Sequence, residues 1–306
     1  MRTWDVIALV ILISILGIGV YFFMYYAPWG KQIEYKPFVA EAGYADLSSQ
    51  SQQFYPNMRY KDKIIGYKIE DVCDGAKKQD AIDAFDILSQ ESVLKFYENT
   101  RNPEIVILCS NIAPSAEEKD HFVAGEGGPS KIINTTVYSV ILLGKVSLYK
   151  VDKCDQPKVA VHEILHALGF DHNKNPKSIM YPVTDCSQTI DQEIINDISR
   201  LYAAPSLPDL IIEKAEANRT SRYVDFQVVI SNLGLKDSEH ATLEVYAGDT
   251  LIKEFNDLND LSIGRGRIIS VTNLFLTGDI GNINFVVKTN EEELSKANNI
   301  AEVSIE

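Results

Sequence analysis

Three of the five histidines in this 306-residue chain lie close together, in the segment VAVHEILHALGFDHN. Residues four apart share one face of a helix, so His162 and His166 can present their imidazoles to one metal ion. Gly169 has no Cβ and can leave the helix in a left-handed conformation, which would bring His172 back as a third ligand. Three neutral imidazoles leave one tetrahedral position open. The spacing therefore predicts one catalytic Zn²⁺ ion.

Glu163 directly follows the first of these histidines and is not needed to hold a metal ion. A carboxylate at this position can reach a metal-bound water and take its proton without binding the metal itself. The alternatives are an amphipathic helix that carries histidines by chance, and a site that binds zinc without catalysis. Glu163 argues against the second alternative, because it is the one residue of the set with no role in holding zinc.

These residues resemble the signature of the metzincin zinc endopeptidases, H-E-x-x-H-x-x-G-x-x-H followed by a Met-turn. Met180, in SIMYP, stands where the Met-turn is expected, and the resemblance implies that it forms an apolar floor for the zinc ligands. Tyr181 and Pro182 follow it as candidates for the substrate pocket. Among metzincins the chain is most similar to the matrixins, over residues 58–203, which implies a protein or peptide substrate. The matching segments are KIIGYKI, the Ala84-Phe85 pair, EIVIL and the Leu201-Tyr202 pair.

The chain also departs from the matrixin pattern. Asn173 stands where matrixins typically have Ser after the third histidine, and Val183 and Thr184 occupy the place of a tyrosine in their specificity loop. Cys73 lies in EDVCDG, which is not the activation motif of that family, and no cysteine-switch propeptide is visible. These departures concern substrate specificity and activation, which the resemblance therefore does not define.

Alternating and helical patterns around the motif predict an α+β domain with a mixed sheet. Strands are expected at residues 64–72, 104–110 and 137–149, and an amphipathic helix over residues 77–90. Strands alternating with helices favour a sheet with helices packed on it. An extended substrate would add beside an edge strand, for which residues 137–143 are the candidate.

Two further helices are expected in this domain. The helix that carries the histidines should begin at Pro157, because Asp155 can cap it and proline fits a first helical turn. A last helix should run over residues 190–202, where Thr189 and Gln192 have the spacing of a capping box.

All four cysteines fall within this domain and none forms a C-x-x-C pair. Two disulfides are therefore expected rather than a second zinc site, with buried free thiols as the alternative. Three pairings are open, and Cys154 with Cys186 is favoured, because it would tie the start of the active-site helix to the segment after the Met-turn. Cys73 and Cys109 would form the second bridge. Disulfides require an oxidising compartment, which favours a location outside the cell.

The last third of the chain has a different sequence pattern. Residues 204–208 form a proline-containing linker, and residues 209–306 contain short strands separated by Asn, Gly and Asp, which predicts an all-β immunoglobulin-like sandwich. This part resembles the CARDB type of cell-adhesion-related domain in PDLIIE, VVISNLG, ATLEVYAGDTLI and NNIAEVSI. The resemblance implies a module that spaces the first domain or binds a surface partner.

The amino-terminal residues are strongly apolar. Residues 6–30 carry no charge, and aromatic residues flank the stretch as they do at membrane interfaces, so residues 1–30 are predicted to form one transmembrane helix. A cleaved signal peptide and a buried helix are the alternatives. Residues 31–57 show no sustained period and are expected to form a stalk. The net charge of −14, from 29 basic and 43 acidic residues, argues against nucleic-acid binding.

Together these features predict a single-pass protein of the cell membrane, with a zinc-dependent endopeptidase domain and a sandwich domain outside. The alternative is a cell-surface adhesion or binding protein whose protease-like domain binds zinc but does not cleave. Calcium is a further candidate ion, but no calcium motif is evident.

Overall fold

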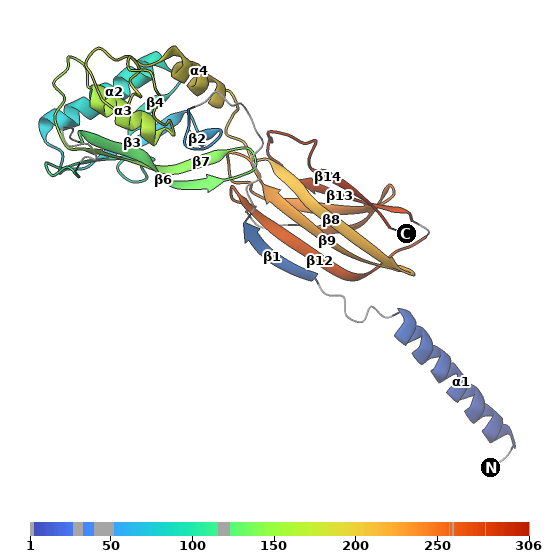
Figure 1. Ribbon diagram of the computed structural model, residues 1–306. Coiled ribbons are helices and arrows are strands. Elements are labelled where there is room, and N and C mark those ends of the chain that lie inside the picture. Colours follow the sequence, from blue (N-terminus) through green and yellow to red (C-terminus); the bar gives the residue numbers. More distant parts are fainter. Residues whose placement is uncertain are drawn as a thin grey trace.

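The computed structural model describes residues 3–26, 33–39, 52–115, 123–256, 258, 260–278 and 280–305. An amino-terminal helix, α1 (Thr3–Tyr26), is followed by two folded units, an α+β domain and a β-sandwich. Figure 1 shows the sandwich between α1 and the α+β domain. The predicted combination of an α+β domain and an all-β sandwich is therefore confirmed.

The α+β domain is built on a six-stranded mixed sheet. Five strands run parallel, and a sixth, β6 (Gly125–Asn134), pairs antiparallel with β7. The parallel strands are, in sheet order, β2 (Met58–Tyr60), β7 (Ser139–Leu148), β5 (Ile105–Cys109), β3 (Ile64–Ile69) and β4 (Lys95–Glu98). Because β7 pairs with β2 and β5 on one side and β6 on the other, it is not an edge strand. The prediction of residues 137–143 as the substrate edge is thus wrong, and β6 is the strand at that edge.

Three helices, α2 (Gly75–Glu91), α3 (Lys158–Ala167) and α4 (Gln192–Leu201), lie on the same side of this sheet (Figure 1). The apolar residues predicted on the first helix pack into the core, where the Phe85 ring stacks on that of Tyr67 with centroids 4.1 Å apart. Asp74 caps α2, since its carboxylate accepts the backbone N–H groups of Ala76 and Lys77.

The predicted caps of the other two helices are not formed. Asp152, rather than Asp155, accepts the backbone N–H of Val159 in the first turn of α3, at 2.8 Å. The capping box of Thr189 and Gln192 is absent, because the backbone of Thr189 pairs with that of residues 177–179 and α4 begins only at Gln192. Tertiary pairing has overridden a local signal in this case.

Two four-stranded antiparallel sheets form the sandwich. One has the order β1-β12-β9-β8 and the other β11-β10-β13-β14, and Phe226, Phe255 and Phe285 lie in the core. Their bounds are β8 (Leu210–Thr220), β9 (Tyr223–Asn232), β10 (Thr242–Ala247), β11 (Thr250–Phe255), β12 (Arg265–Phe275), β13 (Asn282–Lys288) and β14 (Ile300–Ser304).

The remaining strand of the sandwich, β1 (Ile33–Val39), comes from the opposite end of the chain and pairs antiparallel with β12. Residues 52–57, at the other end of the predicted stalk, contact the α+β domain: Phe54 N–H donates to the Gly169 carbonyl at 3.0 Å. The stalk prediction for residues 31–57 therefore needs correction, since both of its described ends belong to domains. Residues 31–32 and 40–51 lie outside the described residues.

The two domains share a small buried apolar cluster of Val140, Leu235 and Ile263. A Cβ placed on Gly264 would lie only 2.5 Å from Cγ2 of Ile133, which is at the end of β6. The predicted linker is held as well, because Leu235 N–H donates to the Leu207 carbonyl at 2.8 Å. Residues 204–208 are thus a packed junction.

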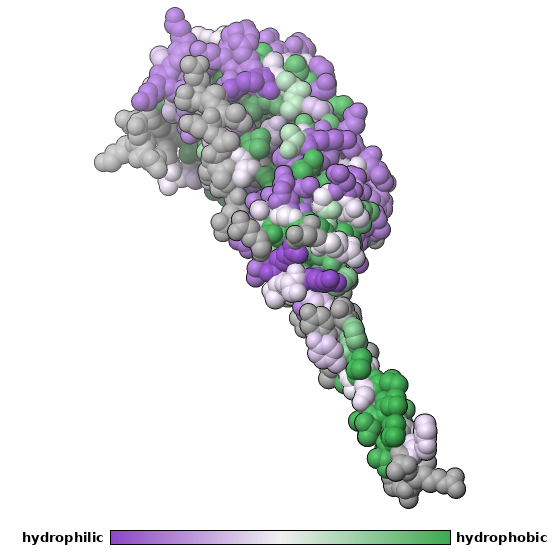
Figure 2. Space-filling view, turned by 90° about the vertical axis from the view of Figure 1, so that its right-hand side faces the viewer, coloured by the Kyte–Doolittle hydropathy of each residue, from purple (hydrophilic) through white to green (hydrophobic). Residues whose placement is uncertain are grey.

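The described side chains of α1 are exposed, including Leu12, Ile15 and Leu16 at 55–61%. Figure 2 shows hydrophobic residues gathered along this helix. Among the described residues, no helix is both long enough and apolar enough to cross a membrane.

Candidate metal centre

The structure brings the three motif histidines together at one point. The Nε2 atom of His166 lies 3.0 Å from that of His162 and 3.1 Å from that of His172, and the third distance is 3.2 Å. Three corners of a tetrahedron around Zn²⁺, with bonds of about 2.0 Å, are about 3.3 Å apart. The three nitrogen atoms therefore have the spacing of a three-histidine zinc site.

The other ring nitrogen of two of these histidines is held by a backbone carbonyl. His162 Nδ1 lies 2.5 Å from the Ile179 carbonyl, and His166 Nδ1 lies 2.7 Å from the Phe170 carbonyl. A carbonyl can only accept, so the proton of each neutral ring belongs on Nδ1 and the lone pair on Nε2. Both rings thus present their lone pairs to the point of convergence.

Burial keeps these rings neutral. It is the main cause that lowers the pKa of His162 and of His166 to about 4, and it also lowers the pKa of His172. A protonated imidazole has no lone pair for a metal, so neutral rings at pH 7 are what a cation site requires. The donor set, its spacing and its protonation all fit Zn²⁺.

The turn after α3 places His172. Gly169 has a φ of +99°, and a Cβ at this position would lie 2.6 Å from Cγ of Met58. Only glycine combines this left-handed backbone with such a close approach. The prediction that a left-handed Gly169 ends the helix and brings His172 back to the other two histidines is confirmed.

Glu163 is buried on α3 beside the edge strand β6. Burial, with a smaller contribution from the charge of Glu126, raises the pKa of Glu163 to about 8. A Cβ on Gly125 would lie 2.7 Å from Cγ of Glu163, and one on Gly127 would lie 2.1 Å from its carbonyl oxygen. Two glycines, alternating along β6, therefore let this strand lie directly against the carboxylate-bearing helix.

A hydrogen-bonded network joins the third-histidine segment to the residues around Met180. Met180 is 1% exposed, and its carbonyl accepts the backbone N–H of Asn173 at 2.9 Å. The Asn173 side chain donates to Ser178 Oγ at 2.6 Å and to Asp191, and Ser178 in turn donates to Asp191. Asn173, one of the departures from the matrixin pattern, thus ties the His172 segment to the turn before Met180.

Both predicted disulfides are present. Cys154 pairs with Cys186 and Cys73 with Cys109, and none of the described cysteines is free. The first bridge links the segment before α3 to the segment after Met180. The second joins the end of β5 to the loop before α2.

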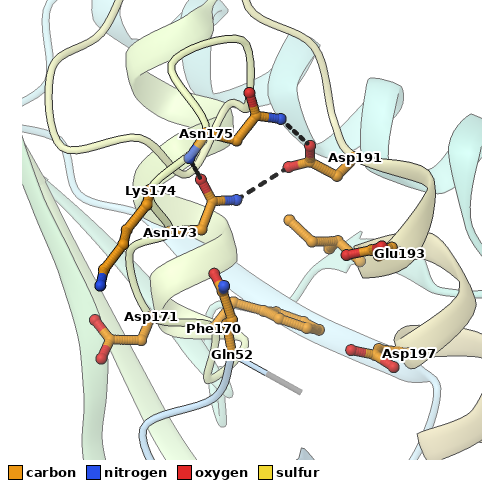
Figure 3. A pocket seen from close by; sticks show the side chains of 10 residues that line it. Gln52, Phe170, Asp171, Asn173, Lys174, Asn175, Asp191, Glu193 and Asp197 are labelled. Atoms are coloured by element: carbon orange, nitrogen blue, oxygen red, sulfur yellow. Dashed lines mark hydrogen bonds between the residues drawn. The ribbon is translucent and has the colours of Figure 1, made fainter. Parts of the chain in front are cut away.

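A pocket lies beside the metal centre, between the third-histidine segment and α4 (Figure 3). It has a volume of about 210 Å³ and is lined by Phe170, Asp171, Asn173, Asp191 and Asp197, among others, but by none of the three histidines. Tyr181 and Pro182 do not line it either, so their assignment to a substrate pocket stays a prediction.

Several residues of the centre are not predicted from the sequence. Gly125 and Gly127 belong to β6, for which no strand is predicted, because glycine and proline are depleted in strands. The alternation of glycines in GEGGP is the signal that could have indicated a close approach. Phe54, whose ring centroid lies 5.6 Å from that of His166, falls in the predicted stalk.

The part of the chain that contains the three histidines is similar to known proteins. Residues 57–203 match the family model of the matrixins, which confirms the resemblance predicted for this part of the chain. A segment of 51 residues is 45% identical to the macrophage metalloelastase of Rattus norvegicus, and the match covers 15% of this chain and only 11% of that protein.

Two solved structures of one CARDB domain are also similar to part of the chain. The CARDB domain of the PF1109 protein from Pyrococcus furiosus, in complex with di-metal ions, is 21% identical over 32% of this chain and 89% of its own, with a TM-score of 0.28. A solution NMR structure of the same domain is 24% identical over 32% and 95% of the two chains, also with a TM-score of 0.28.

Proposed function

We propose that the chain is a zinc-dependent endopeptidase, with His162, His166 and His172 as the zinc ligands and Glu163 as the catalytic base. The match of residues 57–203 to the matrixins supports a metallopeptidase at the level of the family. The observation that carries the proposal for this chain is the convergence of three Nε2 atoms within 3.2 Å of one another, two of them on the helix that also carries Glu163.

Zn²⁺, when bound, would supply Lewis-acid polarisation of the scissile carbonyl and would lower the pKa of water toward neutrality. The protein's own residues do the rest. Glu163, whose ionised form a bound cation beside it would favour, would accept the proton of the attacking water and return it to the leaving amine, so that one carboxylate serves first as base and then as acid. Glu163 is only 7% exposed, so little solvent screens the electrostatic interaction between its carboxylate and a bound cation.

A peptide substrate would bind in an extended conformation beside β6. The strand borders the centre through Gly125 and Gly127, and its far side pairs with no other strand among the described residues. An exposed strand edge offers backbone N–H and C=O groups to a substrate, and so supplies affinity that does not depend on sequence.

The amino-terminal segment would anchor the protein in the cell membrane, with both domains outside. The support is the uncharged stretch of residues 6–30, part of which lies outside the described residues, and the exposed apolar side chains of α1. The two disulfides support an oxidising compartment. Protease protection of intact cells tests the orientation: both domains should be digested without lysis, and full protection would contradict an outside location.

The test of the activity uses the full-length protein in detergent, with casein or a peptide library as substrate. Chelation should abolish cleavage, and Zn²⁺ should restore it. Glu163→Gln should lower kcat/KM by about 100-fold or more while the protein still binds one zinc ion. Glu98→Gln, an exposed glutamate on the opposite edge strand β4, is the matched control and should leave kcat/KM unchanged.

Two results would contradict this function. Cleavage that survives both chelation and Glu163→Gln would exclude the zinc mechanism. Zinc bound at one ion per chain without cleavage of any peptide would instead favour a surface adhesion or binding protein that has lost catalysis.

A further inference from the structure

The proposed function leaves one charged side chain beside the substrate edge unexplained. Glu126 lies on β6 between the two glycines that contact Glu163, and it is exposed. Successive side chains of a strand point to opposite faces of the sheet. Because Gly125 and Gly127 face α3, Glu126 projects from the opposite, open face of β6.

The carboxylate of Glu126 is held in place on that face. Its cross-strand neighbour on β7 is Ser147, and Tyr149, two residues farther along, donates from Oη to Oε2 of Glu126 at 2.7 Å. Tyr149 is fixed in turn, because its backbone N–H donates to the Ala124 carbonyl at 2.9 Å. A hydrogen bond to the carboxylate also raises the pKa of Tyr149, which therefore stays protonated as a donor at neutral pH.

Glu126 takes part in none of the ion pairs found among the described residues, although Lys145 lies on the same face of β7, opposite Gly128. Those ion pairs join other residues, among them Lys68 with Glu70 and Lys77 with Asp74. Glu126 is instead close enough to Glu163 to add to the rise in the pKa of the latter. A negative charge thus stands at the edge where a substrate would lie, and no described side chain forms an ion pair with it.

We propose that Glu126 is a specificity-determining residue that selects a lysine or arginine side chain in the substrate. The inference rests on the proposed function, because it requires a peptide strand beside β6. Residues directly opposite in paired strands project to the same face, with Cβ atoms about 4.5–5.5 Å apart, and opposite charges there are favourable whereas like charges are not. The substrate residue opposite Glu126 would therefore be basic, and its side chain would lie on the open face of the sheet.

The specific effect of Glu126 has to be distinguished from the field of the whole protein. A chain with a net charge of −14 attracts any basic peptide over long distances. That general attraction favours a lysine at every position of a peptide and falls with ionic strength. A cross-strand pair favours lysine at one position only, so a position-by-position comparison separates the two effects.

The test uses the full-length, zinc-loaded protein and fluorogenic peptides that differ only by Lys, Gln or Glu at each position around the cleaved bond. One position should show kcat/KM about three-fold higher for Lys than for Gln, with Glu lower still. Glu126→Gln should remove this preference at that position, and Glu126→Lys should reverse it in favour of Glu. Glu98→Gln removes the same charge from the opposite edge of the sheet and should leave the preference intact.

The outcomes separate this inference from the function on which it rests. Wild-type protein that cleaves peptides without a charge preference at any position, or a preference that survives Glu126→Gln, would overturn the role of Glu126 and leave the endopeptidase intact. Equal loss in Glu126→Gln and Glu98→Gln would assign the preference to the overall charge. Absence of cleavage for every peptide would contradict the proposed function itself.

Discussion

At Gly127 the edge strand β6 and the helix α3 approach so closely that a methyl group does not fit between them. A Cβ at this position would lie 2.1 Å from the Glu163 carbonyl oxygen and 2.7 Å from its carbonyl carbon. Both atoms are backbone, so the strand or the helix would have to move. Gly128, the next residue, offers a direct comparison because a Cβ there meets nothing within 4 Å.

Gly127→Ala is therefore expected to displace β6 or α3 and to destabilise the protein by about 1–3 kcal/mol. The same shift would misplace Glu163 relative to the histidines, so kcat/KM should fall as well. Thermal unfolding and peptide hydrolysis measure the two effects. Gly128→Ala should change neither by a comparable amount, and equal effects of the two variants would contradict the close-approach explanation.

The buried histidines predict a pH-dependent stability for the zinc-free protein. His162 and His166 have a pKa of about 4 when folded, against 6.5 ordinarily. Between these values the unfolded chain binds more protons than the folded one, so the free energy of unfolding falls as the pH falls. Each such histidine contributes up to about 1.4 kcal/mol per pH unit.

Urea unfolding of the chelated protein at pH 7 and pH 5 measures this loss. Glu163, whose pKa is about 8 in the folded protein, opposes this loss over the same pH range, so the comparison is made in Glu163→Gln. In that variant the free energy of unfolding should be clearly lower at pH 5. His240→Gln is the control, because His240 is exposed on the sandwich and should leave the difference unchanged. The same free energy at both pH values would show that the buried rings are not kept neutral by folding.

At the scale of elements, the segment that carries His172 depends on contacts with residues that follow it in the chain. Asn173 bonds to Ser178 and Asp191, and its backbone N–H reaches the Met180 carbonyl. The Cys154–Cys186 disulfide links the segment before α3 to the segment after Met180. His172 is thus positioned by contacts of its segment with later residues, whereas His162 and His166 are positioned by a helix.

Asn173→Ala should consequently weaken zinc binding by about ten-fold, as the loss of a residue that supports a metal ligand typically does. Competition with a zinc chelator of known affinity measures the change. Asn196→Ala on the exposed side of α4 removes a similar amide and should leave the zinc affinity unaltered. An unchanged affinity in Asn173→Ala would show that the His172 segment holds its position without this network.

The parts of the fold that could be predicted from the sequence are those with a local signal. His162 and His166 come together on any regular helix because they are four residues apart, and Gly169 is the residue type that predicts the turn after it. By contrast, β6 contains four residues of Gly-Glu-Gly-Gly that favour no strand, and its conformation is imposed by pairing with β7. Asp152 accepts the backbone N–H of Val159 in the first turn of α3. It lies well before the helix in the sequence, whereas capping patterns consider only the residues next to the helix start.

At the scale of the whole molecule, the sandwich is packed against the strand pair that borders the metal centre. Ile133 and Val140, near the ends of β6 and β7, contact the cluster formed with Leu235 and Ile263. Arg59 of β2 donates to the Ala204 carbonyl at 3.0 Å and so secures the junction. The two domains are therefore expected to influence each other's stability.

Leu235→Ala should remove part of the shared cluster and cost about 2–5 kcal/mol. Hydrogen exchange at the turn between β6 and β7 should become faster, although that turn lies in the other domain. Val245→Ala is the control, because Val245 is buried only within the sandwich core. Similar exchange at the turn in both variants would show that the domains are energetically independent.

The pairing of β1 with β12 has a consequence for the order in which the molecule can be assembled during synthesis. Ile33 lies opposite Val271, so this strand leaves the ribosome before its partner by more than two-thirds of the chain. The α+β domain lies wholly between the two, and its sheet can form before the partner of β1 has been synthesised. Until β12 emerges, β1 carries unpaired backbone groups that another nascent chain could capture. Completion of the sandwich is therefore the last step of assembly, and β1 is the strand that a chaperone would have to shield.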